Sequence, residues 1–328
     1  LAAFADGSRR LRHGVAGNPM TAGVPGAAFV TAGRLAPRRQ SATPLRAYMF
    51  MLAPALVLFI VFILVPVVLT VIGSFFTFGL TSPSWDFAGI ENYVRAVNDP
   101  VFWLSFRNNL IIVFGSILTQ IGFGTLLAAI LDRGIRRGST FFRTLIFAPM
   151  VISSVAVGLI WLMILDPNIG PLNKIVTFLG LTPPSRGWLG DPDLAIWMFL
   201  VVAAWQYTGF MMVLVLAGLQ GVPNEIYQAA ALDGARGIRA FWYITLPSIR
   251  NILIVAVLIT SIGAFKVFDL IYVTTRGGPA NATEVLGTYI YLQAFNLGNM
   301  GYANAIAVVL LVIAVILGLL QLKYSRRA

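Results

Sequence analysis

Residues 194–222 read LAIWMFLVVAAWQYTGFMMVLVLAGLQGV and contain no charged side chain. About 20 apolar residues in a helix are enough to cross a bilayer, so this stretch predicts a transmembrane helix. The same bias runs through the whole chain: of its 328 residues, 58% are hydrophobic and 11% are charged. Soluble domains contain about 25% charged residues. The long charge-free stretches and this composition together predict an all-α polytopic membrane protein.

Five other segments are long and apolar enough to span a bilayer, which gives six transmembrane helices. The predicted spans are residues 49–76, 108–131, 144–165, 194–220, 251–275 and 302–322. They form one transmembrane domain, residues 47–328. Residues 1–46 are rich in Gly, Ala, Pro and Arg and predict a flexible basic tail. Two of the connecting segments, 77–107 and 166–193, are too short for separate domains, so we expect short helices and turns there.

The distribution of Lys and Arg predicts the orientation. Seventeen of these residues lie in the tail, the segments 132–143 and 221–250 and the C-terminus, against five in the loops on the opposite side. Positive charge is enriched on the cytoplasmic side of membrane proteins. We therefore expect a multi-pass membrane protein with both termini in the cytoplasm.

Several functions are disfavoured by missing residue types. The chain has no cysteine, and its one histidine, His13, lies in the tail, so the spans offer neither thiolates nor imidazoles for metal binding or proton transfer. It has no P-loop, so any hydrolysis of ATP must take place in another subunit. The net charge of +11 is spread along the chain without aromatic-interleaved basic patches, which favours contact with membrane lipid over nucleic acid. We expect no catalytic residues, no metal site and no cofactor.

The segment 221–250 predicts a short helix in the cytoplasm. Asn224 is a plausible N-cap, residues 225–233 form the helix, and Gly234 ends it. A second turn or two follows over residues 238–246, and Pro247 breaks it. Four residues share one face of the first helix by their spacing: Glu225, Gln228, Ala229 and Leu232. So short a helix is marginal alone, so it packs either on its own bundle or on a partner.

The stretch QAAALDGARGIRAFWYITLP, residues 228–247, resembles the EAA loop of binding-protein-dependent ABC importer permeases. The family has a glutamate at the position of Gln228, and this glutamate forms an ion pair. Gln228 carries no charge, but Glu225, three residues earlier, is placed to supply one. The resemblance implies an ABC type I importer permease fold with a cytoplasmic coupling helix that docks on an ATPase subunit. The residues implied in coupling are Glu225, Gln228, Ala229, Ala230, Asp233, Gly234, Ile244, Leu246 and Pro247.

Three further stretches narrow the resemblance. FAGIENYVRAV (87–97), FKVFDLIYVTTRGGPANAT (265–283) and GYANAIAVV (301–309) resemble the sugar and polyol branch of these permeases, with maltose, glycerol-3-phosphate and trehalose types, first-subunit form. The resemblance implies that the chain lies in the bacterial cytoplasmic (inner) membrane and forms half of a pathway for a sugar or related polyhydroxylated solute. It also implies three kinds of partner: two ATP-binding subunits, a second homologous permease subunit and an extracytoplasmic solute-binding protein.

Polar side chains within predicted spans are candidates for the pathway because burying them in a membrane is costly. They are Gln120, Trp205, Gln206, Tyr207, Lys266 and Asp269. Each has an alternative role. Lys266 and Asp269, three residues apart, would pair on one helix or reach the outer interface, the glutamines would tie helices together, and Trp205 would pack in the core.

Two other classes of function remain as alternatives. A secondary transporter or channel usually has ionisable residues near the midplane, which four of the six spans lack between their ends. A membrane enzyme, such as a lipid-linked glycosyl transferase, would need clustered acids or histidines. The acids of the predicted outer loops are scattered: Asp86, Asp99, Asp166, Asp191 and Asp193.

Overall fold

The computed structural model describes residues 45–80, 84–133 and 138–325. The predicted tail, residues 1–46, lies outside the described residues except for Leu45 and Arg46, which begin helix α1 (Leu45–Phe59). The chain divides into two units, Leu1–Pro54 and Ala55–Ala328. All the contacts below belong to the second unit.

Four helical runs in the described residues are long and apolar enough to cross a membrane without a sharp bend. They coincide with the predicted spans at 49–76, 108–131, 194–220 and 302–322, except that the second begins at Pro100. The predicted span begins after Arg107 because it is defined by the length of chain without charge. The helix itself begins at Pro100, where Asp99 caps it by accepting a hydrogen bond from the N–H of Val101 at 2.8 Å. The runs consist of α1, a π-helical turn η1 (Ile60–Leu64) and α2 (Val65–Gly73); α4 (Pro100–Ser116), η2 (Ile117–Ile121) and α5 (Gly122–Arg133); α9 (Ala195–Gln220); and α16 (Met300–Ser325).

The predicted span 144–165 is not one continuous helix. It is replaced by α6 (Ser139–Val151) and α7 (Ser154–Ile164), which meet at 97°. Pro149 removes a backbone donor near the end of α6, and Ser153 caps α7 by accepting from the N–H of Ala156 at 3.3 Å.

The predicted span 251–275 also contains a break, and a bend precedes it. A helical run of α11 (Ile238–Ala240), η3 (Phe241–Thr245) and α12 (Leu246–Ser248) meets α13 (Arg250–Phe265) at 73°. Helix α13 then ends at Phe265, and α14 (Asp269–Thr274) begins after three intervening residues. If each bent pair counts as one span, the described residues hold up to six candidate spans by length and composition.

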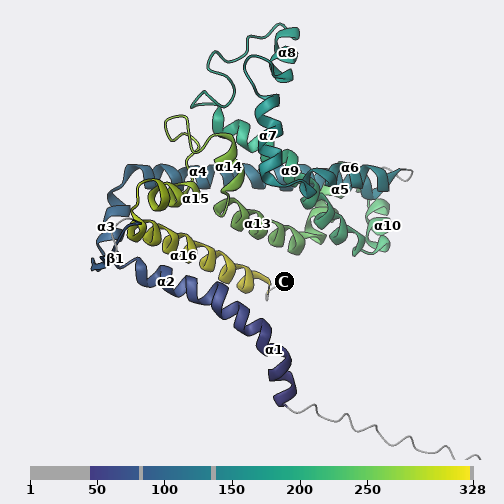
Figure 1. The fold of residues 1–328 in the computed structure, drawn as a ribbon. Coiled ribbons are helices and arrows are strands. Elements are labelled where there is room, and N and C mark those ends of the chain that lie inside the picture. The colour runs from purple at the N-terminus through teal and green to yellow at the C-terminus, as the bar shows by residue number, and fades with distance from the viewer. Residues whose placement is uncertain (1–44, 81–83, 134–137, 326–328) are drawn as a thin grey trace, which may run out of the picture. The chain divides into compact units, whose positions relative to one another are not determined.

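The connecting segments contain short elements. Strands β1 (Phe76–Thr77) and β2 (Asp86–Phe87) pair antiparallel, with Phe76 opposite Phe87. Short helices lie in both predicted loop regions, and α8 projects away from the long helices (Figure 1). The remaining elements are α3 (Glu91–Asn98), α8 (Pro171–Phe178), α10 (Asn224–Leu232), α15 (Leu286–Tyr291) and η4 (Leu292–Asn296).

Helix α9 is the centre of the packing. It lies against α5 and α6, while α16 lies alongside α2 and α13 (Figure 1). The contact with α6 is so close that a Cβ atom at Gly209 would be 2.1 Å from the carbonyl oxygen of Ile146. Only glycine permits this approach, so Gly209 fixes the distance between the two helices.

Two side-chain amides of α4 form hydrogen bonds with the end of α13 and with the segment that follows α14. Asn108 Nδ2 donates to the carbonyl oxygens of Ala282, at 3.1 Å, and Glu284, at 2.9 Å. Asn109 donates to the carbonyl of Ala264 at 3.0 Å, and its Oδ1 accepts from the N–H of Leu286 at 2.9 Å. These buried hydrogen bonds hold the broken end of α13 beside α4.

Candidate functional site: a central cavity and an exposed loop

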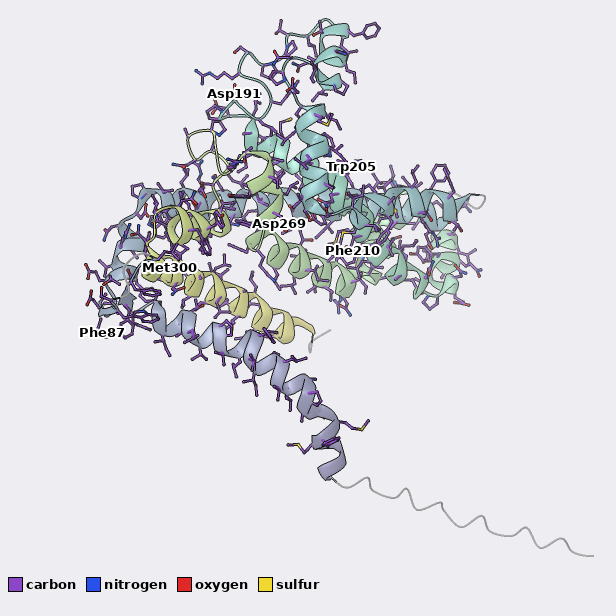
Figure 2. The ribbon with its side chains drawn as sticks, in the orientation of Figure 1. Phe87, Asp191, Trp205, Phe210, Asp269 and Met300 are labelled. Atoms are coloured by element: carbon purple, nitrogen blue, oxygen red, sulfur yellow. The ribbon has the colours of Figure 1, made fainter. Side chains whose placement is uncertain are left out.

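A cavity of about 290 Å³ lies among the helices of the second unit. This volume is close to the lower limit of about 300 Å³ that is typical of small-molecule sites. Four of the six predicted pathway residues line it, from three separate parts of the chain: Gln120, Tyr207, Lys266 and Asp269. Asp269 and Phe210, which also lines it, lie near the centre of the view in Figure 2.

The other two predicted pathway residues do not line this cavity. Gln206 is buried, with 1% of its surface exposed, and its Nε2 donates to the carbonyl of Ile152 at 3.2 Å and to Ser154 Oγ at 3.4 Å. Those contacts agree with the alternative role as a tie between helices. Trp205 is 41% exposed, borders a different hollow and meets the ring of Trp161 edge to face at 5.9 Å.

Pairing of Lys266 with Asp269 on one helix, one of the alternative roles considered for them, is not found in the structure. Lys266 is the C-cap of α13, and Asp269 is the first residue of α14. The break between the two helices removes the helical spacing, and both side chains are exposed beside the cavity without an ion pair between them within 4 Å. Asp269 is well placed at the N-terminus of α14, where the helix dipole favours negative charge.

Sequence reasoning missed the contribution of the segment between α6 and α7. Met150 and Ser154, on either side of the bend, line the cavity together with Phe199 and Phe210 of α9. A signal for the bend exists in the sequence, because Pro149 and the pair Ser153 and Ser154 interrupt an otherwise apolar segment. The bend brings a polar turn to the cavity wall where a straight span would present only apolar side chains.

The second site is the loop that contains α10. The face predicted from helical spacing is exposed: Glu225, Gln228, Ala229 and Leu232 all reach solvent, and Leu232 is 89% exposed. Ala230 differs from the other predicted coupling residues, because it is 6% exposed and packs on its own chain. The helix therefore has an inner side that rests on the protein and an outer side that contacts nothing in the described chain.

The ends of α10 differ in how well the sequence predicts them. The N-cap is Pro223, not Asn224, and no side chain caps the helix. At the C-terminus, Gly234 has a φ of +81°, its N–H donates to the carbonyl of Ala231 at 3.3 Å, and the N–H of Ala235 donates to Ala230 at 2.8 Å. This paired arrangement is a Schellman motif, which requires a left-handed residue and favours glycine. Gly234 thus ends the helix as predicted.

The second part of the loop extends further than predicted. Pro247 does not break the helix, which continues to Ser248. The π-helical turn η3 precedes the proline, and its wider hydrogen-bonding spacing accommodates a residue without an N–H. Ile244 and Leu246 are half-buried, Pro247 and Asp233 are exposed, and Tyr227 Oη donates to Thr245 Oγ1 at 3.3 Å, which links α10 to this run.

Long apolar helices around a solute-sized cavity, with an exposed loop beside them, define an integral membrane transport subunit. The described residues contain no group of three His, Cys, Asp or Glu side chains that would hold a metal ion. The sequence profile of the binding-protein-dependent transport system inner membrane components matches residues 120–328. The chain belongs to this family, which consists of transport subunits and not of enzymes, and the resemblance seen in the sequence is confirmed.

Individual relatives of this chain are also transport permeases. A probable ABC transporter permease protein of Bacillus subtilis, YurN, is 42% identical over 280 residues, which cover 85% of this chain and 95% of the relative. The trehalose/maltose transport system permease protein MalF of Thermococcus litoralis is 34% identical over 84% of this chain and 92% of its own length. A chain of a bacterial ABC transporter involved in the import of the acidic polysaccharide alginate matches with a TM-score of 0.74 at 23% identity, covering 86% of this chain and 96% of that one. The predicted importer permease fold is thereby confirmed.

Proposed function

We propose that this chain is the permease subunit of an ATP-driven importer and forms half of the pathway for a sugar or related polyhydroxylated solute. The central cavity carries this proposal. It combines an amide (Gln120), hydroxyls (Ser154, Tyr207) and aromatic rings (Phe199, Phe210), the groups that suit a neutral solute with many hydroxyls. A relative named for trehalose and maltose transport supports the same solute class.

The exposed face of α10 supports coupling to a separate ATPase. Ala229 has no large side chain, so a partner's backbone has room to approach closely, and Leu232 supplies an uncovered apolar contact. Glu225 and Gln228 lie on the same face and provide a charge and an amide. We infer that two ATP-binding subunits dock on this loop and on its counterpart in a second, non-identical permease subunit.

The orientation follows from charge. Because Lys and Arg gather in the tail, in the segments 132–143 and 221–250 and at the C-terminus, we infer that both termini and the α10 loop face the cytoplasm. The opposite side would then receive solute from an extracytoplasmic binding protein. Energy would come from ATP and not from an ion gradient, which separates this proposal from a secondary transporter.

Purification of the chain with its neighbouring subunits, followed by reconstitution in liposomes, tests the proposal. We expect an ATPase subunit and a second permease to copurify, and sugar-loaded binding protein to stimulate ATP hydrolysis. Uptake should persist when ionophores collapse proton and sodium gradients. Absence of an ATPase partner, or uptake abolished by ionophores alone, would overturn it.

A further inference from the structure

The bend between α6 and α7 positions a pair of hydroxyl groups at the cavity wall. Ser154, the first residue of α7, lies with its Oγ 3.1 Å from Tyr207 Oη of α9, and both residues line the cavity. Gln206, the neighbour of Tyr207, points to the bend, where its Nε2 donates to the carbonyl of Ile152 and to Ser154 Oγ. The bend, the amide and the two hydroxyls therefore form one connected network.

Counting donors in this network leaves one hydroxyl hydrogen unused. Gln206 spends both hydrogens of its amide on Ile152 and Ser154. Ser154 and Tyr207 have one O–H each, and one of the two is spent on the bond between them. If Tyr207 donates to Ser154, the Ser154 O–H is left over; if Ser154 donates, the Tyr207 O–H is left over. No other hydrogen bond of either hydroxyl exists in the described residues, and the buried Oε1 of Gln206 accepts from neither. Both residues line the cavity, so in either case one hydroxyl donor beside the cavity has no partner within the described chain.

We propose that Ser154 and Tyr207 form a solute-reading subsite that donates a hydrogen bond to a hydroxyl or ring oxygen of the transported sugar. The proposal rests on the function proposed above and adds the atoms that recognise the solute. Phe210 is three residues from Tyr207 on the cavity side of α9, so its ring is placed to cover the apolar face of the same sugar unit. Gln206 is a positioning residue, because it holds the hydroxyl pair and does not line the cavity.

The subsite exists because the span is broken. In an unbroken helix the carbonyl of Ile152 would be satisfied by a backbone N–H four residues on. The 97° bend frees this carbonyl, and the buried amide of Gln206 satisfies it. The adjacent hydroxyl of Ser153 is used differently, because it caps α7 through Ala156 and does not line the cavity. Ser153 is therefore a matched control for Ser154.

Equilibrium binding of sugar to the purified importer complex tests the subsite. The probes are radiolabelled maltose, trehalose, lactose and xylose, and the sugar that binds the wild-type complex most tightly is then used throughout. We expect the double variant Ser154→Ala with Tyr207→Phe to raise the Kd about three- to tenfold, the size of one neutral hydrogen bond. Ser153→Ala should leave the Kd unchanged while lowering the melting temperature of the complex.

A second readout distinguishes recognition of the solute from a structural role. The wild-type complex should bind one monodeoxy analogue of the chosen sugar about three- to tenfold more weakly than the parent, whereas the double variant should bind the two equally. If the double variant keeps both the wild-type Kd and the discrimination, the subsite is refuted although the importer function stands. If no sugar binds or stimulates the wild-type complex, the proposed function fails and the subsite fails with it.

Discussion

The loop around α10 and the bundle around the cavity are encoded in different ways. The loop is a local structure: a short helix, a glycine in the left-handed conformation and a second helical run lie within about 25 residues of sequence. The cavity joins Gln120, Ser154, Tyr207 and Asp269, which are far apart in the chain. The geometry of the loop therefore depends on its own residues, whereas the cavity depends on where distant helices break and how closely they pack.

The two regions also differ in what covers them. The outer face of α10 is exposed, so substitutions there should spare the fold and affect only a partner. The helices around the cavity pack so closely that the backbone of α9 approaches the backbone of α6 at Gly209. Small changes there should therefore affect the fold itself.

The largest effect is expected from Ala229→Trp. Ala229 is exposed on α10, so an indole there meets nothing in this chain but overfills a closely approaching partner. Overpacking of about 3 kcal/mol corresponds to roughly a hundredfold weaker association with the ATPase subunit. Copurification and ATP hydrolysis stimulated by the binding protein would measure the loss.

Thr177→Trp, at an exposed position of α8, is the control and should leave ATPase association intact. Full association of the Ala229→Trp chain would show that this face is not the docking surface.

The next effect concerns the bundle. Gly209→Ala would place a Cβ atom 2.1 Å from the carbonyl oxygen of Ile146 and 2.8 Å from Phe147 Cα, and backbone atoms cannot rotate away. We expect a loss of about 3 kcal/mol in the free energy of unfolding, measured by thermal unfolding in detergent. Gly122→Ala is the matched control: no atom lies within 4 Å of its Cβ, so the helix should gain up to about 1 kcal/mol. Equal stability of the two variants would mean that α6 and α9 do not pack at this distance.

The sequence was sufficient for the loop and for the existence of the long helices. Charge-free length predicted α9 to within a residue of each end, and spacing predicted which residues share one face of α10. Both properties follow from neighbours in sequence. The exceptions are informative: Pro247 did not end the helix, since the preceding π-helical turn absorbs it, and Ala230 turned inward although it belongs to the same motif.

The bends were not predicted because hydropathy carries no information about helix direction. Residues 144–165 are uncharged and mostly apolar, which predicts one span, although Pro149 and two serines divide them. The break after Phe265 similarly separated Lys266 from Asp269. The identities of four cavity residues could be predicted from their cost in a membrane, but Ser154 required the bend to be known.

A smaller effect is expected at Asp99, which joins α3, α4 and α16 at one end of the bundle. Its carboxylate accepts from Tyr302 Oη at 2.6 Å, from Tyr289 Oη and from the N–H of Val101. Burial raises the pKa of this carboxyl, but these hydrogen bonds outweigh burial and hold the pKa below its usual value of 3.8. Ionised Asp99 therefore stabilises the fold at neutral pH, and this contribution is lost as pH falls through the lowered pKa.

Asp99→Asn should lower the free energy of unfolding by about 1 kcal/mol at pH 7, with the difference shrinking in acid as Asp99 itself becomes protonated. Thermal unfolding at neutral and acidic pH measures it. Asp166→Asn is the control, because the pKa of Asp166 is also lowered, by hydrogen bonds from the N–H groups of Ile169 and Asn168, but these bonds lie within one turn and join no helices. A pH-independent difference for Asp99→Asn would mean that the cap acts through shape and not through charge.

The smallest effect separates Glu225 from Gln228, the position where the loop departs from its family. Both side chains are exposed on one face of α10, three residues apart, so a single basic residue of the ATPase is within reach of either. An exposed ion pair contributes about 0.2–1 kcal/mol and is screened by salt. We expect Glu225→Gln to weaken ATPase association by up to about fivefold at low salt and to have little effect at high salt.

Adding Gln228→Glu to that variant should restore association, whereas Gln228→Glu alone should change it by less than about twofold because the basic residue is already paired. If Gln228→Glu strengthens the wild-type complex as much as it rescues the Glu225→Gln complex, the two positions act independently, and Glu225 does not replace the missing carboxylate.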